Sequence, residues 1–221
     1  MRERDYGQYC GLARALDVVG ERWALLIVRD LLSGPRRFGE LQNGLPRIPS
    51  NVLTNRLKHL EAAGVVERVV LPAPARGTAY ALTGDGRALE ETLVALGRWG
   101  ALRLGEPRPG EIVTAESFAM ALRTTFRPDP VSDPVTSGAD DAPITYEIHL
   151  GDLVTHATVR AAQVIAGTGP AAHADLVIHT GPRIKEVMAG EVSPSEALRT
   201  GLAVIHGPRR LWTRFARTFR T

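Results

Sequence analysis

The sequence contains a single cysteine, Cys10, so no disulfide can form within the 221-residue chain. An unpaired thiol fits a reducing compartment. No apolar run approaches the ~20 residues that a membrane-spanning helix needs, and no apolar signal segment follows the first residues. The sequence therefore predicts a cytoplasmic protein that has no membrane partner.

Patterns that would indicate an enzyme or a metal site are also lacking. No Ser-His-Asp set, phosphate-binding loop or carboxylate pair stands out. Five histidines lack metal-ligand spacing with carboxylates or cysteines, and we interpret them as surface or satisfied core groups: His149, His156, His173, His179 and His206. The sequence predicts a protein that is not an enzyme, with no metal and no cofactor.

The net charge of +3 is modest and unevenly distributed. Residues 1–105 carry 15 basic against 11 acidic side chains, whereas residues 106–221 carry 12 against 13. Between residues 34 and 80 the count is seven against three. A basic segment favours a polyanionic partner, but an ordinary solvated surface is the alternative, because 25 of the 27 basic residues are arginines. Charge alone does not decide between them.

Residues 50–63 predict a helix with two different faces. Three leucines at i, i+4 and i+7 form a stripe that requires a core: Leu53, Leu57 and Leu60. Four polar residues form a second stripe: Asn51, Thr54, Asn55 and Lys58. Asparagine is a mediocre helix former, so two asparagines on an outward-facing stripe call for an explanation. We expect Ser50 as the N-cap or Pro49 at the first helical position.

The elements around this helix supply the explanation. Helices are predicted over 10–19, 21–32, 37–44, 50–63 and 85–104, and strands over 65–71 and 78–83 around the Pro- and Gly-rich loop 72–77. Four helices, a hairpin and a long helix form a winged helix-turn-helix layout. In it, residues 37–63 are the helix-turn-helix and the loop 72–77 is the wing.

The second stripe then becomes a surface for reading DNA. Asparagine makes bidentate hydrogen bonds to adenine, and Ser and Thr reach several bases. The predicted base-reading residues are Ser50, Asn51, Thr54 and Asn55. The predicted phosphate-binding residues are Arg36, Arg37, Arg47, Arg56 and Lys58, and Arg76 on the wing is expected to contact the backbone or a minor groove. The alternative is an ordinary solvated helix face.

The same region resembles the HxlR family of bacterial winged-helix regulators over residues 6–104. The resemblance is carried by Cys10, Gly-Glu-Arg-Trp at 20–23, Arg-Phe-Gly-Glu-Leu at 37–41, Ile48-Pro49, Leu53, Arg56-Leu57, Leu60-Glu61, Gly64, Tyr80 and Leu82-Thr83. It implies a DNA-binding homodimer whose first and last helices form the dimer surface. The seam Leu89, Leu93 and Leu96 agrees, because it needs a partner.

Residues 105–113 are Gly- and Pro-rich, and we predict a linker at 106–113 between domains at 1–105 and 114–221. In the second domain the sequence predicts helices over 115–126, 182–189 and 208–220, and another helix that begins at the capping box 193–196. Strands are predicted over 144–150, 153–160, 174–180 and 202–206. The Pro-, Asp- and Ser-rich segment 127–143 is expected to be a mobile loop.

This half resembles the sterol carrier protein type-2-like domain over residues 112–221. The resemblance is carried by 174–178, 188–190, 193–198, 201–207 and the closing aromatic helix. It implies an α/β sandwich with an apolar tunnel for a lipid-like molecule, and an α+β protein overall. The predicted ligand-binding residues are Phe118, Leu122, Phe126, Met188, Leu211, Trp212 and Phe215. The aromatic ones are interpreted as core in the first instance, and some of them are expected to line a ligand cavity as well.

These observations predict a homodimeric, ligand-responsive DNA-binding regulator of a kind that is more often a repressor than an activator. Its expected partners are double-stranded DNA, a second copy of itself and a small hydrophobic ligand. A redox sensor using Cys10 is one alternative, since a helix N-terminus lowers a thiol pKa, although a small buried Cys10 is the favoured interpretation. A lipid carrier with a dimerisation module that does not bind DNA is another. The arginines of the last helix are taken as a solvated face, with a DNA contact or an anionic headgroup as the alternatives.

Overall fold

The computed structural model describes residues 6–105, 107–128 and 142–221. The chain divides into two compact units, Met1–Leu93 and Val94–Thr221, and each is described by itself. Most of the segment expected to be a mobile loop, 127–143, lies outside the described residues. No described helix has the length and apolar character needed to cross a membrane.

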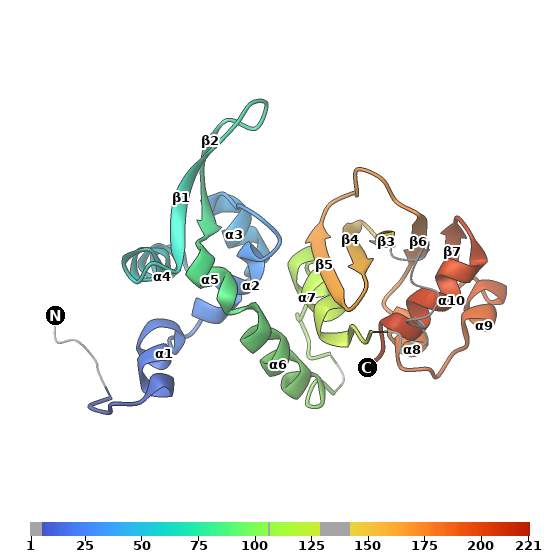
Figure 1. Cartoon of the computed structure of the whole chain (residues 1–221), viewed down its shortest axis with the longest axis horizontal. Coiled ribbons are helices and arrows are strands. Elements are labelled where there is room, and N and C mark those ends of the chain that lie inside the picture. The colour runs from blue at the N-terminus through green and yellow to red at the C-terminus, as the bar shows by residue number, and fades with distance from the viewer. Residues whose placement is uncertain (1–5, 106, 129–141) are drawn as a thin grey trace. The chain divides into compact units, whose positions relative to one another are not determined.

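The first unit has the predicted order of elements (Figure 1). Its helices are α1 (Gly11–Val19), α2 (Ala24–Leu31), α3 (Phe38–Gly44), α4 (Ser50–Ala62) and α5 (Gly84–Ala88). Strands β1 (Val66–Leu71) and β2 (Gly77–Leu82) pair antiparallel, and Figure 1 shows this hairpin extending beyond the helices. The winged helix-turn-helix predicted from the sequence is confirmed.

Local chemistry sets the ends of these helices. Trp23 has a φ of 81°, in the left-handed region, so α2 begins at Ala24 rather than at residue 21. Pro49 is extended and is the N-cap of α4, which begins at Ser50. A helix with Ser50 as its N-cap would have begun one residue later, and one with Pro49 at its first position would have begun one residue earlier. The hydroxyl of Thr83 accepts a hydrogen bond from the Gly86 N–H and starts α5.

The long helix predicted over 85–104 is instead two helices. Helix α5 ends at Ala88, and α6 runs over Glu90–Ala101. The boundary between the two compact units falls within α6, after Leu93. Part of α6 packs within the second unit, because the Arg98 Nε donates to the Thr124 carbonyl at 3.0 Å. The expected domain limits at 105 and 113 stay a prediction.

The second unit combines a five-stranded mixed sheet with helices, so the α+β class is confirmed. Its strands are β3 (Ile144–Leu150), β4 (Leu153–Arg160), β5 (Gln163–Thr168), β6 (Leu176–Thr180) and β7 (Ala203–His206), in the order β5-β4-β3-β6-β7. Among these described strands, β3 and β6 pair in parallel and the other neighbours pair antiparallel. Its further helices are α7 (Ala115–Thr125), α8 (Ile184–Met188), α9 (Pro194–Arg199) and α10 (Arg209–Thr218).

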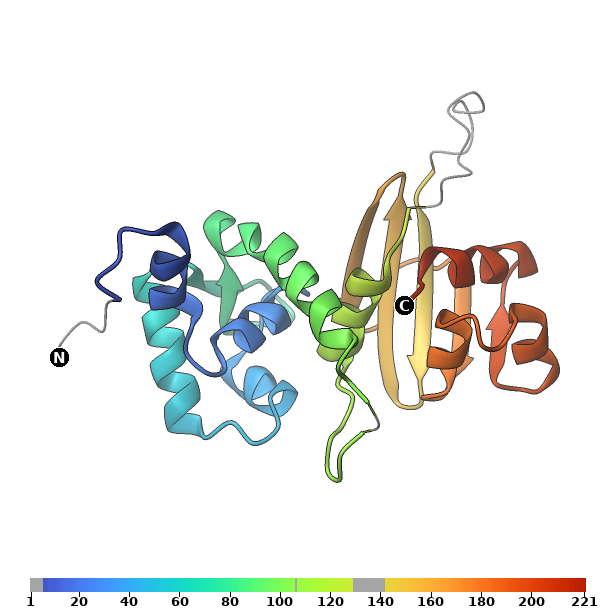
Figure 2. The ribbon, with the colours of Figure 1, turned by 90° about the horizontal axis from the view of Figure 1, so that it is seen from below.

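One face of this sheet carries the core. Alternation along β3 turns Tyr146, Ile148 and Leu150 inward, and the buried aromatic rings of α10 pack on them as one cluster. The Tyr146 and Phe215 rings meet edge to face, with centroids 5.4 Å apart. Figure 2 shows α8, α9 and α10, in orange and red, gathered beside one another. The helices therefore form a layer against the sheet.

Candidate nucleic-acid interface

Helix α4 has the two faces that its sequence predicts. Leu53, Leu57 and Leu60 are 0%, 1% and 0% exposed. Asn51 and Asn55 lie on the exposed side. Because the leucines fix the orientation of α4, the two amides must point away from the core, and their donor and acceptor groups remain available to a partner.

The other polar residues of α4 differ in what they offer. Lys58 is exposed, as a phosphate-binding residue should be. Ser50 is also exposed, whereas Thr54 is half-buried and its hydroxyl donates to the Ser50 carbonyl at 2.8 Å. That bond occupies the only hydroxyl donor of Thr54. Thr54 therefore retains only acceptor capacity toward a base.

The turn between α3 and α4 places Arg47 at the surface. Arg47 is exposed and has a φ of 73°, in the left-handed region that is costly for residues other than glycine. Its neighbour Ile48 is 5% exposed. The left-handed residue reverses the chain, so Ile48 enters the core and Arg47 stays outside.

Arg37 connects the start of α3 to the wing. Its guanidinium donates to the carbonyls of Ala75 and Arg76, the latter at 2.7 Å. Gly77, which begins β2, has a φ of 121° that a side chain would strain. Arg37 was predicted to bind phosphate, and the structure shows it holding the wing loop. Arg76 itself is exposed.

The base of the wing is fixed by backbone and side-chain contacts. Arg36 exchanges two backbone hydrogen bonds with Tyr80, at 2.9 and 2.7 Å, so the segment before α3 pairs with β2. Arg68 on β1 forms an ion pair of 3.2 Å with Glu61 of α4 and lies over the Tyr80 ring. These contacts fix the wing relative to α4.

Arg56 has a partner that sequence reasoning missed. Its Nη2 lies 3.0 Å from the Glu21 carboxylate, and its side chain is only 24% exposed. The two residues are 35 positions apart, so no helical spacing indicated the pair. Arg56 was expected to bind phosphate, but in the structure its ion pair with Glu21 holds α4 against the segment before α2.

Cys10 lies at the N-terminus of α1 and is exposed. The favoured interpretation of a small buried residue was therefore wrong. Backbone N–H groups of Ala13 and Leu12 hydrogen-bond the sulfur and lower the pKa of the Cys10 thiol. The exposed position and the lowered pKa both favour reaction with electrophiles.

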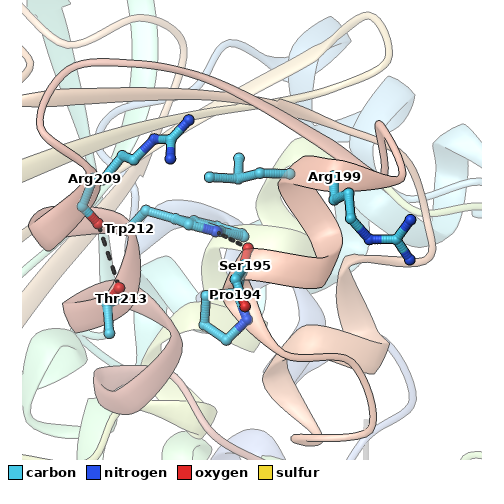
Figure 3. Close-up of a pocket in the computed structure, with 7 residues that line it drawn as sticks. Pro194, Ser195, Arg199, Arg209, Trp212 and Thr213 are labelled. Carbon is cyan, nitrogen blue, oxygen red and sulfur yellow. Dashed lines mark hydrogen bonds between the residues drawn. The ribbon is translucent and has the colours of Figure 1, made fainter.

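The residues predicted to bind a ligand in the second unit pack together as core. Six of them are at most 7% exposed and Leu211 is half-buried: Phe118, Leu122, Phe126, Met188, Leu211, Trp212 and Phe215. Trp212 also borders a hollow of about 360 Å³ between α9 and α10. Figure 3 shows this hollow with Arg209 on one side of the Trp212 indole and Pro194 and Ser195 on the other.

The known proteins that resemble this chain match mainly its first unit. Residues 18–107 match the family model described as HxlR-like helix-turn-helix. The chain is 42% identical over 86 residues to the uncharacterized HTH-type transcriptional regulator YvaP of Bacillus subtilis, a match that covers 39% of this chain and 80% of that protein. It is 43% identical over 98 residues to the uncharacterized regulator Rv3095 of Mycobacterium tuberculosis, covering 44% of this chain and 60% of that protein.

Solved structures of such regulators are also similar. The putative HTH-type transcriptional regulator ytcD is 34% identical, with a TM-score of 0.40 over 44% of this chain and 99% of that one. The reduced form of YodB from B. subtilis is 34% identical, with a TM-score of 0.38 over 47% of this chain and 100% of that one. The relatives are transcriptional regulators and not enzymes. Through its N-terminal unit, the chain belongs to the HxlR-like helix-turn-helix family of transcriptional regulators.

Proposed function

We propose that the protein is a homodimeric, ligand-responsive repressor that reads an inverted-repeat operator through α4. The observation that carries this proposal is the outward position of Asn51 and Asn55 above three fully buried leucines. Both amides suit bidentate contacts to adenine in the major groove. Two copies related by a two-fold axis would read half-sites about one helical turn, ~34–36 Å, apart.

Exposed apolar side chains support self-association. On α1, Leu12 is 69% exposed and Leu16 is 39% exposed, and on α6, Leu96 and Trp99 are 46% and 57% exposed. Large exposed apolar side chains on a helix commonly mark a protein interface. The resemblance to the family implies a dimer surface on the first and last helices of the domain, and we propose α1 and α6 for that role.

The proposal of base reading is tested with Asn51→Ala and Asn55→Ala in a binding assay over a library of duplex sequences. Each substitution should change the preference at one base pair by about 1–3 kcal/mol. Gln163→Ala removes an exposed amide from the second unit and should leave the preference unchanged. Equal weakening on every sequence would refute the assignment of readers. No duplex binding by the wild-type chain at moderate salt would favour the lipid-carrier alternative.

We assign ligand sensing to the second unit. The helix layer on one face of its sheet supports the likeness to a sterol carrier domain, and the hollow between α9 and α10 has the size of a small-molecule site. Leu198 and Trp212 give it apolar walls, and Arg209 gives it a cation, so an apolar molecule with an anionic group suits it. To regulate, that molecule must bind the DNA-bound and DNA-free states with different affinity.

Mass spectrometry of the natively purified protein tests for such a molecule directly. Ser195→Trp should fill the hollow and abolish the ligand's effect on DNA binding, while binding in its absence stays unchanged. Ala162→Trp places the same side chain on an exposed turn between β4 and β5 and serves as the control. A ligand response that survives Ser195→Trp would place the sensing site elsewhere.

The exposure of Cys10 favours a second candidate, a redox-sensing regulator. Because its thiol pKa is lowered, the thiolate fraction is larger at a given pH than for an ordinary cysteine, and the thiolate is the nucleophile. Oxidant-sensitive operator binding that disappears in Cys10→Ser would support this candidate. Operator binding that is indifferent to alkylation of Cys10 would remove it.

A further inference from the structure

The last helix of the second unit carries an unusual concentration of positive charge. Its sequence, Arg-Arg-Leu-Trp-Thr-Arg-Phe-Ala-Arg-Thr, contains no acidic residue, and another arginine follows at 220. The arginines are exposed except for the half-buried Arg214: Arg209, Arg210, Arg214, Arg217 and Arg220. Within the described parts of the chain, none of the five forms an ion pair.

Other arginines in the same unit do have acidic partners. Arg183 and Arg199 lie 2.8 and 2.6 Å from Glu186 and Glu196, each three residues away on the chain. Intrahelical pairing is therefore common in this unit, and α10 departs from it. The departure needs a reason, because unpaired like charges on one helix oppose its stability.

Three of the arginines form one continuous row. Arg210, Arg214 and Arg217 recur at i, i+4 and i+7, and we call them the arginine row. The opposite side of α10 carries Trp212 and Phe215, which are 1% and 0% exposed in the core. Packing of the aromatic side fixes which way the row faces. Arg210 and Arg217 are exposed, whereas Arg214 is half-buried and its charge also acts on the buried Tyr146.

The arrangement opposes helix stability in a second way. Arg209 and Arg210 lie in the first turn of α10, where the positive end of the helix dipole disfavours cations. No acidic residue occupies that turn. A negatively charged partner would relieve both this effect and the repulsion within the row.

The positive charge continues past the end of α10. The Arg220 N–H donates to the Thr125 carbonyl, and the Arg127 guanidinium donates to the Thr124 and Phe126 carbonyls at 2.9 Å. The pKa of Arg127 is lowered by partial burial and then by the positive charges of Arg98 and Arg220. The charges of Arg98 and Arg220 therefore act on Arg127 near the end of α10.

We propose that the arginine row is a second DNA-contacting surface, which binds the phosphate backbone of a duplex. From Arg210 to Arg217 the helix rises by roughly 10 Å. Successive phosphates of one DNA strand are about 3.4 Å apart along the duplex axis, so the row spans about three phosphates. Guanidinium groups match phosphate oxygens in bidentate geometry. This inference rests on the proposed DNA-binding function and extends the contact to the second unit.

Other anionic partners fit the surface less well. A bilayer surface would require an apolar face to insert, and the apolar face of α10 is buried in the core. A small organic anion would require an enclosing pocket, whereas Arg210 and Arg217 are exposed on the outer side of a helix. A row of cations suits an extended polymer with regularly spaced charges. Backbone contacts of this kind add affinity without sequence preference.

The test compares two triple variants of the full chain on mixed-sequence duplex DNA. Arg210→Gln, Arg214→Gln and Arg217→Gln together remove the row. Arg160→Gln, Arg183→Gln and Arg199→Gln remove the same net charge from exposed positions of the same unit. The measured quantity is the slope of the logarithm of the binding constant against the logarithm of salt concentration. The row variant should lose about 2–3 from the magnitude of this slope, since each phosphate contact contributes about 0.9.

Each outcome separates the inference from the function on which it rests. A wild-type chain that does not bind duplex DNA would refute the proposed function itself. A wild-type chain that binds, with the same slope in the row variant, would refute the inference alone, as would an equal loss in the control variant. A thermal unfolding temperature no lower than that of the wild type, and recovery of the slope when the three arginines are replaced by Lys, would show that the loss comes from charge. Loss of binding to single-stranded RNA but not to duplex DNA would also overturn the inference.

Discussion

The two units use arginine in different ways. In the first unit, Arg37 holds the wing loop, Arg56 pairs with Glu21, and Arg68 pairs with Glu61. Along α10 of the second unit, arginines stand in a row without acidic partners among the described residues. A partnered arginine keeps two segments in place, whereas an arginine without a partner leaves its charge available to another molecule.

This difference changes how the DNA-binding face should be interpreted. Two arginines that the sequence assigns to phosphates, Arg37 and Arg56, instead hold segments of the first unit in place. The groups that remain outward and without a described ion pair are the α4 amides, Lys58 and Arg76. Under the proposed function, sequence reading and phosphate binding by the first unit would depend on fewer residues than its arginine content indicates.

The largest expected effect comes from the buried face of α4, on which the orientation of the reading face depends. Leu57→Ala should lower the free energy of unfolding by about 2–5 kcal/mol, because it leaves a cavity at a 1% exposed position. Asn55→Ala on the exposed face should change it by less than about 0.5 kcal/mol. Chemical denaturation measures both. Similar costs at the two positions would contradict the division of α4 into a core face and a reading face.

A partnered arginine of the first unit gives the next largest effect. Arg37→Gln should release the wing loop and weaken DNA binding by about 1 kcal/mol, the value of an ordinary hydrogen bond, because the site is exposed. Hydrogen exchange at the amides of 75–77 should become faster in the variant. If Arg37 bound phosphate instead, exchange in the wing would stay the same and only the salt dependence would fall.

The sequence was informative wherever local patterns decide the outcome. The leucine spacing in α4 and the alternation in β3 predicted which side chains are buried. Strand β5 was missed, because Gln163–Thr168 is a short strand at the sheet edge with a glycine and a weak alternation. The single helix expected over 85–104 was wrong because the break at Leu89 has no proline or glycine to mark it.

The site was less predictable because long-range contacts decide it. Arg37 meets the wing 38 and 39 residues away, and Arg56 meets Glu21 at a separation of 35. No periodicity relates such positions. The aromatic residues expected to line a ligand cavity have the same sequence signature as core, and in the structure they pack as core. Composition indicates that a side chain is buried, but it does not indicate what it is buried against.

The Arg56–Glu21 pair tests the same difference between the two units, with a smaller expected change in the free energy of unfolding. A double-mutant cycle with Arg56→Gln and Glu21→Gln should give a coupling of about 0.2–1 kcal/mol in unfolding, as expected for partly exposed pairs. Glu21→Gln should leave the salt dependence of DNA binding unchanged. A coupling near zero, together with a shallower salt dependence of DNA binding for Arg56→Gln alone, would support the phosphate-binding role that the sequence predicts for Arg56.

The smallest expected effect concerns α10. If the arginine row opposes the stability of its own helix, Arg210→Gln should raise the free energy of unfolding by a few tenths of a kcal/mol at low salt, since it removes a cation from the first turn and a like-charge neighbour of Arg214. The gain should disappear in high salt, where the repulsion is screened. Arg183→Gln breaks a pair with Glu186 and should change stability in the opposite direction. Thermal unfolding at two salt concentrations separates the two variants. A loss of stability in both would mean that the arginines of α10 have partners of their own within the protein, and the contrast between the two units would then fail.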